Sequence, residues 1–296
     1  MKKSIQFVIL TCTVSWIIAG TAILCGLRQA QGPIYLIFAS SYMMLPAICS
    51  VILQIIHKEK PFRNIGISFK FNRWFIIAGI VPVIYTFVTL GINLLFPHVS
   101  FSAAYEGYLS TLSAEQAQIA MQQLAMVPPV IFFFIQLFSA IVAGYTINNL
   151  LGFGEELGWR GYFLKSLKHK KMLPASLIIG TVWGLWHFPL ILIGHNYPLH
   201  PIIGVGMMII FCILLTPMMI YIVIKSGSVI TASIFHGVNN AIGGITLLYL
   251  VGGNDLINGI TGLAGFIALL LMNVIFILYD TYITKERIIT SVIGDY

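Results

Sequence analysis

Five ionisable side chains and one amide occur inside apolar stretches of this sequence, where such groups are costly and usually serve a function. They are Glu155, Glu156, Arg160, His187, His236 and Asn240. The set combines two carboxylates, two imidazoles, a guanidinium and an amide from three separate segments. A carboxylate in apolar surroundings suits general-base chemistry. These groups can act together only if the elements that carry them meet in the fold.

The first segment reads Glu155-Glu156-x-x-x-Arg160. In a helix, Glu156 and Arg160 are four residues apart and share a face, so they can form a charge-assisted pair. Glu155 is turned about 100° away and remains the freer carboxylate. The alternative is the start of a cytoplasmic helix, where acidic residues are favoured in the first turn.

The second segment places His187 one helical turn after Trp183 and two residues before Pro189. The indole can pack beside the imidazole, and the proline can kink the helix and free backbone carbonyls. A single histidine in an apolar span is often a satisfied core residue. The depth of His187 in its span favours a functional role instead.

The third segment holds His236 and Asn240, whose spacing of four puts both side chains on one helix face. Gly237, Gly243 and Gly244 would let a neighbouring helix approach closely. The alternative is that the asparagines here form hydrogen bonds that only hold helices together.

The composition predicts an all-α, polytopic membrane protein. Charged residues make up 8% of the 296 residues, and 58% are hydrophobic, whereas an average soluble domain has roughly 25% charged residues. So few charges cannot keep a globular surface wet, so lipid must cover most of it. The net charge of +7 then reports on topology, and no nucleic-acid partner is expected.

About eight stretches have the length and composition of membrane spans, which need about 20 apolar residues. They cover about residues 5–25, 34–56, 74–96, 127–147, 172–194, 201–224, 228–250 and 258–280. With this count, 15 of the 16 Lys and Arg residues fall on one side, and only Arg28 falls on the other. Positive residues collect on the cytoplasmic side, so both termini are predicted to be cytoplasmic.

The apolar run that ends at Leu24 is interpreted as the first span. A cleaved signal peptide is the rival interpretation, but the run is long for one and no small-x-small cleavage site follows. The outer loop 97–126 has no Lys or Arg, and capping-box spacing at Ser113 and Gln116 predicts a short helix there.

Between residues 127 and 164 the charged residues are Glu155, Glu156 and Arg160. This stretch is too long for one upright span, so we predict a break near residues 148–154 and a second helix starting near Glu155. Non-helical backbone at membrane depth is tolerated where it lines a watery cavity. A break beside two carboxylates therefore predicts an intramembrane cavity.

The remaining polar groups and thiols are interpreted as structural. The four cysteines have no metal-like or redox-like spacing and read as packing residues in apolar runs: Cys12, Cys25, Cys49 and Cys212. Four histidines lie at span ends or in loops, where solvation is ordinary: His57, His169, His195 and His200.

Taken in order, the three motifs resemble those of the CPBP family of intramembrane proteases. That family includes type II CAAX prenyl endopeptidases and bacterial relatives linked to bacteriocin immunity. The resemblance covers about residues 150–250. The second family motif usually has phenylalanine where this chain has Trp183, so an aromatic residue is kept.

The resemblance implies hydrolysis of a peptide bond within the membrane or at its cytoplasmic edge. Glu155, with His187, would position and deprotonate a water. His236 and Asn240 would donate hydrogen bonds to the oxyanion, and the Glu156–Arg160 pair would brace the site. The implied partners are a membrane-associated or lipidated (CAAX-like) peptide and the lipid bilayer, and we expect the plasma membrane of a bacterium.

Many family members are labelled metalloproteases, and Glu155, His187 and His236 could form a zinc site with an open water position. No His-Glu-x-x-His motif is present, so we favour a mechanism without a metal cofactor. Two other functions stay open. One is a membrane protein that acts by binding, such as an immunity factor. The other is a transporter, although no internal repeats are found.

The chain is divided into three regions on this basis. Residues 1–126 would hold three spans and the outer loop, residues 127–280 would form the protease-like core of five spans, and residues 281–296 would be a cytoplasmic tail. The motif positions predict different membrane depths for the residues that should meet in one site. Glu155 would be nearly cytoplasmic, whereas His187 would lie about 22 Å into its span.

Overall fold

A computed structural model describes residues 2–110 and 112–296. The predicted all-α, polytopic membrane architecture is confirmed, because five helices within these described residues are long and apolar enough to cross a membrane. These are α1 (Lys3–Leu24), the continuous pair α2 (Pro33–Tyr42) and α3 (Leu45–Ile56) together, α4 (Arg73–Asn93), α12 (Pro201–Ser226), and α14 (Leu263–Leu278) with the π-helical η4 (Tyr279–Thr284). Their exposed faces carry mostly isoleucine and leucine, as lipid contact requires.

The other three predicted spans contain shorter helices. They are α7 (Pro129–Tyr145), α10 (Met172–Trp186) and α13 (Val229–Ile242). The 15 residues of α10 extend about 22 Å, less than the roughly 30 Å of a hydrocarbon core. The full-length spans predicted at 172–194 and 228–250 therefore differ from the structure, since α10 stops before Pro189 and α13 stops before Gly243.

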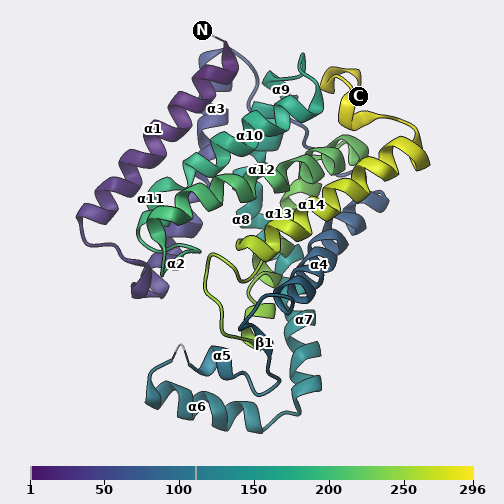
Figure 1. Cartoon of the computed structure of the whole chain (residues 1–296). Helices are drawn as coiled ribbons and strands as arrows, with labels where there is room; N and C mark the ends of the chain where they lie inside the picture. The colour runs from purple at the N-terminus through teal and green to yellow at the C-terminus, as the bar shows by residue number, and fades with distance from the viewer. Residues whose placement is uncertain (1, 111) are drawn as a thin grey trace.

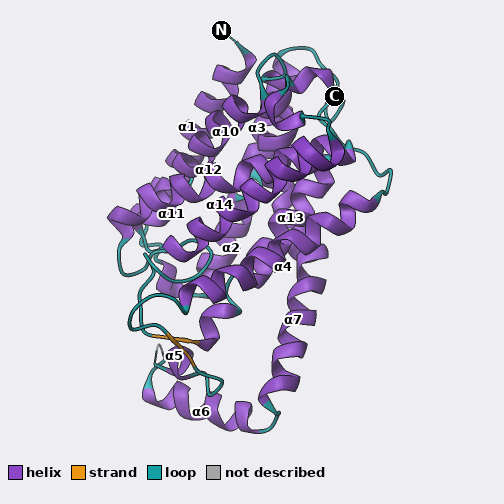
Figure 2. Cartoon of the chain, turned by 45° about the vertical axis from the view of Figure 1, so that its right-hand side comes forward, coloured by secondary structure: helices purple, strands orange, loops and turns teal. Residues whose placement is uncertain are grey.

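Both termini lie at one end of the molecule, and α5 (Glu106–Leu109) and α6 (Ala114–Ala125) lie at the other (Figures 1 and 2). A chain that crosses the membrane an even number of times has both termini on the same side, which agrees with this arrangement. Which side of the membrane this end faces stays a prediction. The short helix expected in the outer loop is present as α6, and a Ser113–Gln116 capping box begins it.

The small remaining elements connect these helices. The two-residue strands β1 (Ser100–Phe101) and β2 (Leu250–Val251) pair antiparallel, with Ser100 opposite Val251. The others are the short helices η1 (Gln29–Gln31), α11 (Phe188–Leu192), η3 (Thr246–Tyr249), η5 (Ile288–Thr290) and η6 (Ile293–Asp295). All four cysteines are free of disulfides.

The helix break lies at Thr146, just before the stretch near residues 148–154 where it was predicted, and the second helix starts at Ile147 and not near Glu155. Helix α8 (Ile147–Glu156) runs through Gly152 and Gly154 without interruption. These glycines serve close packing instead. A Cβ atom on Gly154 would lie 2.8 Å from the Met43 carbonyl oxygen, and one on Gly152 would lie 3.2 Å from that of Ser233.

A π-helical segment, η2 (Leu157–Phe163), continues α8 directly and leads into α9 (Leu164–Ser166). Glu155 is therefore near the end of α8, not at the start of a helix as predicted. It lies 11 residues before Ser166 in one continuous helical body, which places it about 16 Å from the end of that body. This depth removes the conflict between Glu155 and His187, because the carboxylate is carried inward.

Helix α13 packs against α8, α7 and α4 in the centre of the bundle. The predicted role of Gly237 in close helix approach matches the structure here. A Cβ atom at this position would lie 2.4 Å from the Gly144 carbonyl oxygen and 2.6 Å from the Asn149 amide nitrogen. Backbone atoms from two neighbouring helices thus leave no room for a side chain.

Gly237→Ala is expected to destabilise the fold by about 1–3 kcal/mol, the usual cost of overpacking a core. Thermal unfolding in detergent would measure this against Gly91→Ala. An added Cβ atom at Gly91, which is inside α4, meets nothing within 4 Å. Equal midpoints for the two variants would contradict the close α13–α8 contact.

Candidate active site

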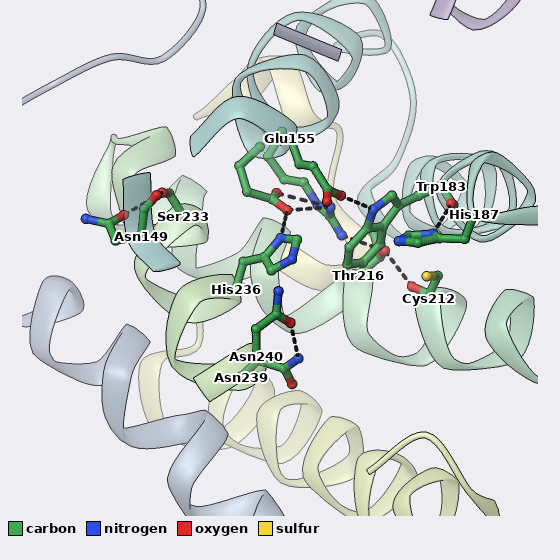
Figure 3. A network of polar contacts seen from close by, with 12 residues as sticks. Asn149, Glu155, Trp183, His187, Cys212, Thr216, Ser233, His236, Asn239 and Asn240 are labelled. Carbon is green, nitrogen blue, oxygen red and sulfur yellow. Dashed lines mark hydrogen bonds and ion pairs between the residues drawn. The ribbon is translucent and has the colours of Figure 1, made fainter. Parts of the chain in front are cut away.

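The three motif segments meet around a cavity of about 490 Å³. Helix α8 contributes Glu155, α10 contributes Trp183, and His187 follows at the end of α10. His236 and Asn240 line the same cavity from α13 (Figure 3). The structure thus places all four side chains predicted to be catalytic at one cavity. Their catalytic roles stay a prediction.

Glu156 lies behind the cavity and is the centre of a buried ionic network. Each of its carboxylate oxygens lies 3.1 Å from Nη1 of Arg160, as the helical spacing predicts. His236 Nδ1 donates to Glu156 Oε1 at 2.8 Å. Arg160 also donates from Nη2 to Thr216 Oγ1 at 2.9 Å. Because both charged side chains are completely buried, each depends on the other for compensation.

Trp183 has a larger part in the site than the sequence indicated. Its ring lies beside His187 as predicted, with centroids 5.7 Å apart. In addition, its Nε1 donates to Glu155 Oε2 at 2.7 Å, and the Arg160 guanidinium lies 4.1 Å from its ring centroid. A single indole therefore holds the cavity carboxylate and covers the buried cation.

Each of the two histidines is held through its Nδ1 atom, which bonds to an oxygen. His187 Nδ1 lies 2.7 Å from the carbonyl oxygen of Trp183, and His236 Nδ1 bonds to Glu156. Carbonyl and carboxylate oxygens only accept, so both Nδ1 atoms carry the proton. The Nε2 atoms make no hydrogen bond within residues 2–110 and 112–296. Both are thus available to a water or a substrate in the cavity.

Asn240 is fixed through its neighbour. Asn239 Nδ2 donates to Asn240 Oδ1 at 3.2 Å, and Asn239 Oδ1 accepts from the Tyr85 hydroxyl of α4. The free amide nitrogen of Asn240 points toward His236 in Figure 3. The amide is therefore presented as a donor beside the imidazole.

The end of α10 is held by the N-terminal helices. The Trp186 carbonyl oxygen accepts from the Tyr42 hydroxyl at 3.0 Å and from Trp16 Nε1 at 3.3 Å. The Trp186 indole donates to Ser15 Oγ at 2.8 Å. Since His187 is the next residue, α1 and α2 set the position of this imidazole.

Two supporting residues escaped sequence reasoning, Tyr85 and Thr216, whereas Asn239 forms an interhelical hydrogen bond of the kind expected for the asparagines. Thr216 lies in the apolar run of α12 and Tyr85 in that of α4, and neither is charged or part of a motif. Tyr85 is 154 positions from its partner Asn239. Short-range spacing carries no signal for such contacts.

The described residues contain no group of three or more His, Cys, Asp and Glu side chains that could hold a metal ion. Glu155, His187 and His236 line one cavity but do not form such a group. The effect of a chelator on cleavage tests metal dependence directly.

Trp183→Phe is expected to lower the free energy of unfolding by about 1.5–3 kcal/mol, the range for hydrogen bonds to charged groups. The change removes the donor to Glu155 Oε2 but keeps an aromatic ring. Trp159→Phe is the matched control, because the buried Trp159 Nε1 has no hydrogen-bond partner among the described residues. Unfolding by denaturant would compare them, and an equal loss would contradict a strong Trp183–Glu155 bond.

Comparison with known proteins agrees with the motifs. Residues 129–242 match the model of the Rce1-like family of type II CAAX prenyl endopeptidases. The predicted resemblance to the CPBP family is thereby confirmed over residues 129–242, and the chain has the fold of a polytopic membrane protein. The matched region contains all the predicted catalytic and supporting residues.

Among curated proteins, the chain is similar to CAAX prenyl protease 2 of Methanococcus maripaludis. The two are 27% identical over 188 residues, which is 63% of this chain. The aligned part spans 62% of the length of that relative.

Proposed function

We propose that this chain is an intramembrane endopeptidase that hydrolyses a peptide bond with a water activated by Glu155. One observation carries the proposal. The Glu155 carboxylate, the Nε2 atoms of two oriented histidines and the amide of Asn240 share one cavity inside a membrane bundle. Similarity to a CAAX prenyl protease supports the same reaction class.

In the proposed reaction, Glu155 takes a proton from a water that His187 Nε2 helps to position. The hydroxide forms a bond to the scissile carbonyl carbon, and the carbonyl oxygen becomes an oxyanion. Asn240 and a protonated His236 Nε2 donate hydrogen bonds to it. Glu155 then returns the proton to the leaving nitrogen as the C–N bond breaks. The Glu156–Arg160 pair keeps His236 in place.

The lining of the cavity supports a membrane-associated or lipidated (CAAX-like) peptide as the substrate. Apolar side chains from four helical elements and the turn between α2 and α3 complete the wall: Leu36, Met43, Leu190, Met208, Phe211 and Leu247. Such a wall can bury an apolar or lipidated segment while the polar cluster meets the peptide bond. The proposed location is a cell membrane, with both termini on the cytoplasmic side.

Purified protein in detergent should cleave fluorogenic peptides, and lipidated peptides should be cleaved faster than the same sequences without lipid. A strong chelator should leave the rate unchanged within about twofold if the Glu155 mechanism needs no metal. Chelator-sensitive cleavage that zinc restores would instead assign Glu155, His187 and His236 as ligands. Well-folded protein that cleaves no peptide of a broad set would favour a function in binding.

A further inference from the structure

A second and larger cavity, of about 950 Å³, lies away from the catalytic cavity. It is formed by the first residues of the chain, the loop between α3 and α4, and the η2–α9 segment, at the end of the molecule that holds both termini. Seven cationic side chains line it: Lys2, Lys3, Lys58, Lys60, Arg63, Lys165 and Lys168. The catalytic proposal uses none of them.

The positive charge in this cavity is largely uncompensated. Glu59 is the carboxylate of the lining, and it pairs with Lys3. The other six cations have no ion pair within the part of the chain that the structure describes. Burial, and then the neighbouring Lys168, lower the pKa of the Lys165 ammonium. Cations that crowd one cavity in this way favour an anionic ligand.

The loop that carries three of these cations is held in a fixed shape. Gln54, at the end of α3, is completely buried. Its Oε1 accepts from the Phe62 amide at 2.9 Å, and its Nε2 donates to the Arg63 carbonyl at 3.0 Å. Lys58 and Phe62 have positive φ angles of 57° and 60°, which non-glycine residues rarely adopt. The backbone of the loop that carries these cations is therefore held in place without a ligand.

Tyr162 gives an independent indication of a ligand. Its side chain lines this cavity and is only 5% exposed, yet its hydroxyl is buried and has no hydrogen-bond partner among the described residues. A buried hydroxyl without a partner costs free energy unless something bonds to it. A phosphate oxygen would accept this hydrogen bond and balance the lysines at the same time.

The helices beside the cavity are apolar and exposed. Ile5 and Ile9 of α1 are 46% and 52% exposed, and Ile55 and Ile56 of α3 are 60% and 61% exposed. Helices α1 and α3 pack against each other. A cationic cavity thus borders directly on an apolar surface, which matches a molecule with an anionic head and hydrocarbon chains.

We propose that this cavity binds the phosphate-bearing headgroup of an anionic phospholipid, with its acyl chains along α1 and α3. The Tyr162 hydroxyl donates to a phosphate oxygen, and the surrounding Lys and Arg side chains neutralise the charge. The shared chemistry of lipid and free phosphate is the phosphate group. The apolar border favours the lipid.

The test is retention of phosphatidylglycerol by the full-length protein, measured by native mass spectrometry after exchange from detergent micelles. Phosphatidylcholine with the same chains and free glycerol phosphate are compared. Lys58→Gln/Lys165→Gln should weaken phosphatidylglycerol binding roughly tenfold or more. Tyr162→Phe, which removes only the hydroxyl, should weaken it about threefold to tenfold.

The matched control is Lys70→Gln/Lys171→Gln, which removes the same charge from exposed positions that do not line the cavity. It should change binding by less than about twofold. An equal loss in both double variants would overturn the proposal in favour of diffuse attraction by the whole basic face. Free glycerol phosphate bound as tightly as the lipid, or no preference over phosphatidylcholine, would also overturn it. Because binding is measured without cleavage, the result is independent of the protease proposal.

Discussion

Glu155→Gln should reduce peptide cleavage by about 10²–10⁴-fold, the contribution typical of a general base. The amide has nearly the same volume and can still accept the hydrogen bond from Trp183 Nε1. It cannot take a proton from water at neutral pH. The fold should therefore persist while the chemical step is lost. Single-turnover cleavage by purified variants would measure the effect.

Glu115→Gln makes the same chemical change on the exposed face of α6, and it should leave the cleavage rate unchanged. Thermal unfolding would establish that both variants are folded. A folded Glu155→Gln variant that keeps more than about a tenth of the wild-type rate would rule out Glu155 as the general base. If the wild type and the Glu155→Gln variant produce the same phenotype although neither cleaves peptides, the protein acts by binding a partner.

Arg160→Met is expected to lower the free energy of unfolding by about 3–5 kcal/mol, because it leaves a buried carboxylate without its cation. Glu156 is fully buried and would keep His236 as its remaining charged partner. Thr216 would also lose the Nη2 hydrogen bond. Equilibrium unfolding in mixed micelles would measure the loss.

The double variant Glu156→Leu/Arg160→Met removes both charges and should be more stable than Arg160→Met alone. Lys3→Met is a useful comparison, since it breaks the exposed Lys3–Glu59 pair and should cost no more than about 1 kcal/mol. If Arg160→Met costs as little as Lys3→Met, the buried network does not depend on charge compensation.

The helical membrane architecture followed from composition, because a helix that crosses the hydrocarbon core needs about 20 mostly apolar residues. The Glu156–Arg160 contact was equally predictable, since it depends on local helical spacing. The match of residues 129–242 to a known family lies where the motifs had pointed. Each of these features depends either on residues close together in the sequence or on the overall hydropathy of a segment.

The helix break before Glu155 was predicted at the wrong residues because glycine can either interrupt a helix or allow close packing. Gly152 and Gly154 suggested a broken helix, but they let neighbouring backbone approach α8. The Trp183 partner of Glu155 and the His236 partner of Glu156 were also beyond prediction. The Trp183 and His236 contacts join residues 28 and 80 positions apart, and such pairings depend on how helices are arranged in space.

The anchoring of Trp186 by Ser15, Trp16 and Tyr42 has a consequence for how the chain can be divided. Sequence similarity to the Rce1-like family begins at residue 129, but the position of His187 is set by contacts of Trp186 with residues 144 to 171 positions earlier in the chain. A fragment cut at the boundary of similarity would lack the donors that cap α10 and the α2 wall of the cavity. The smallest working unit of this protein is therefore larger than its recognisable part.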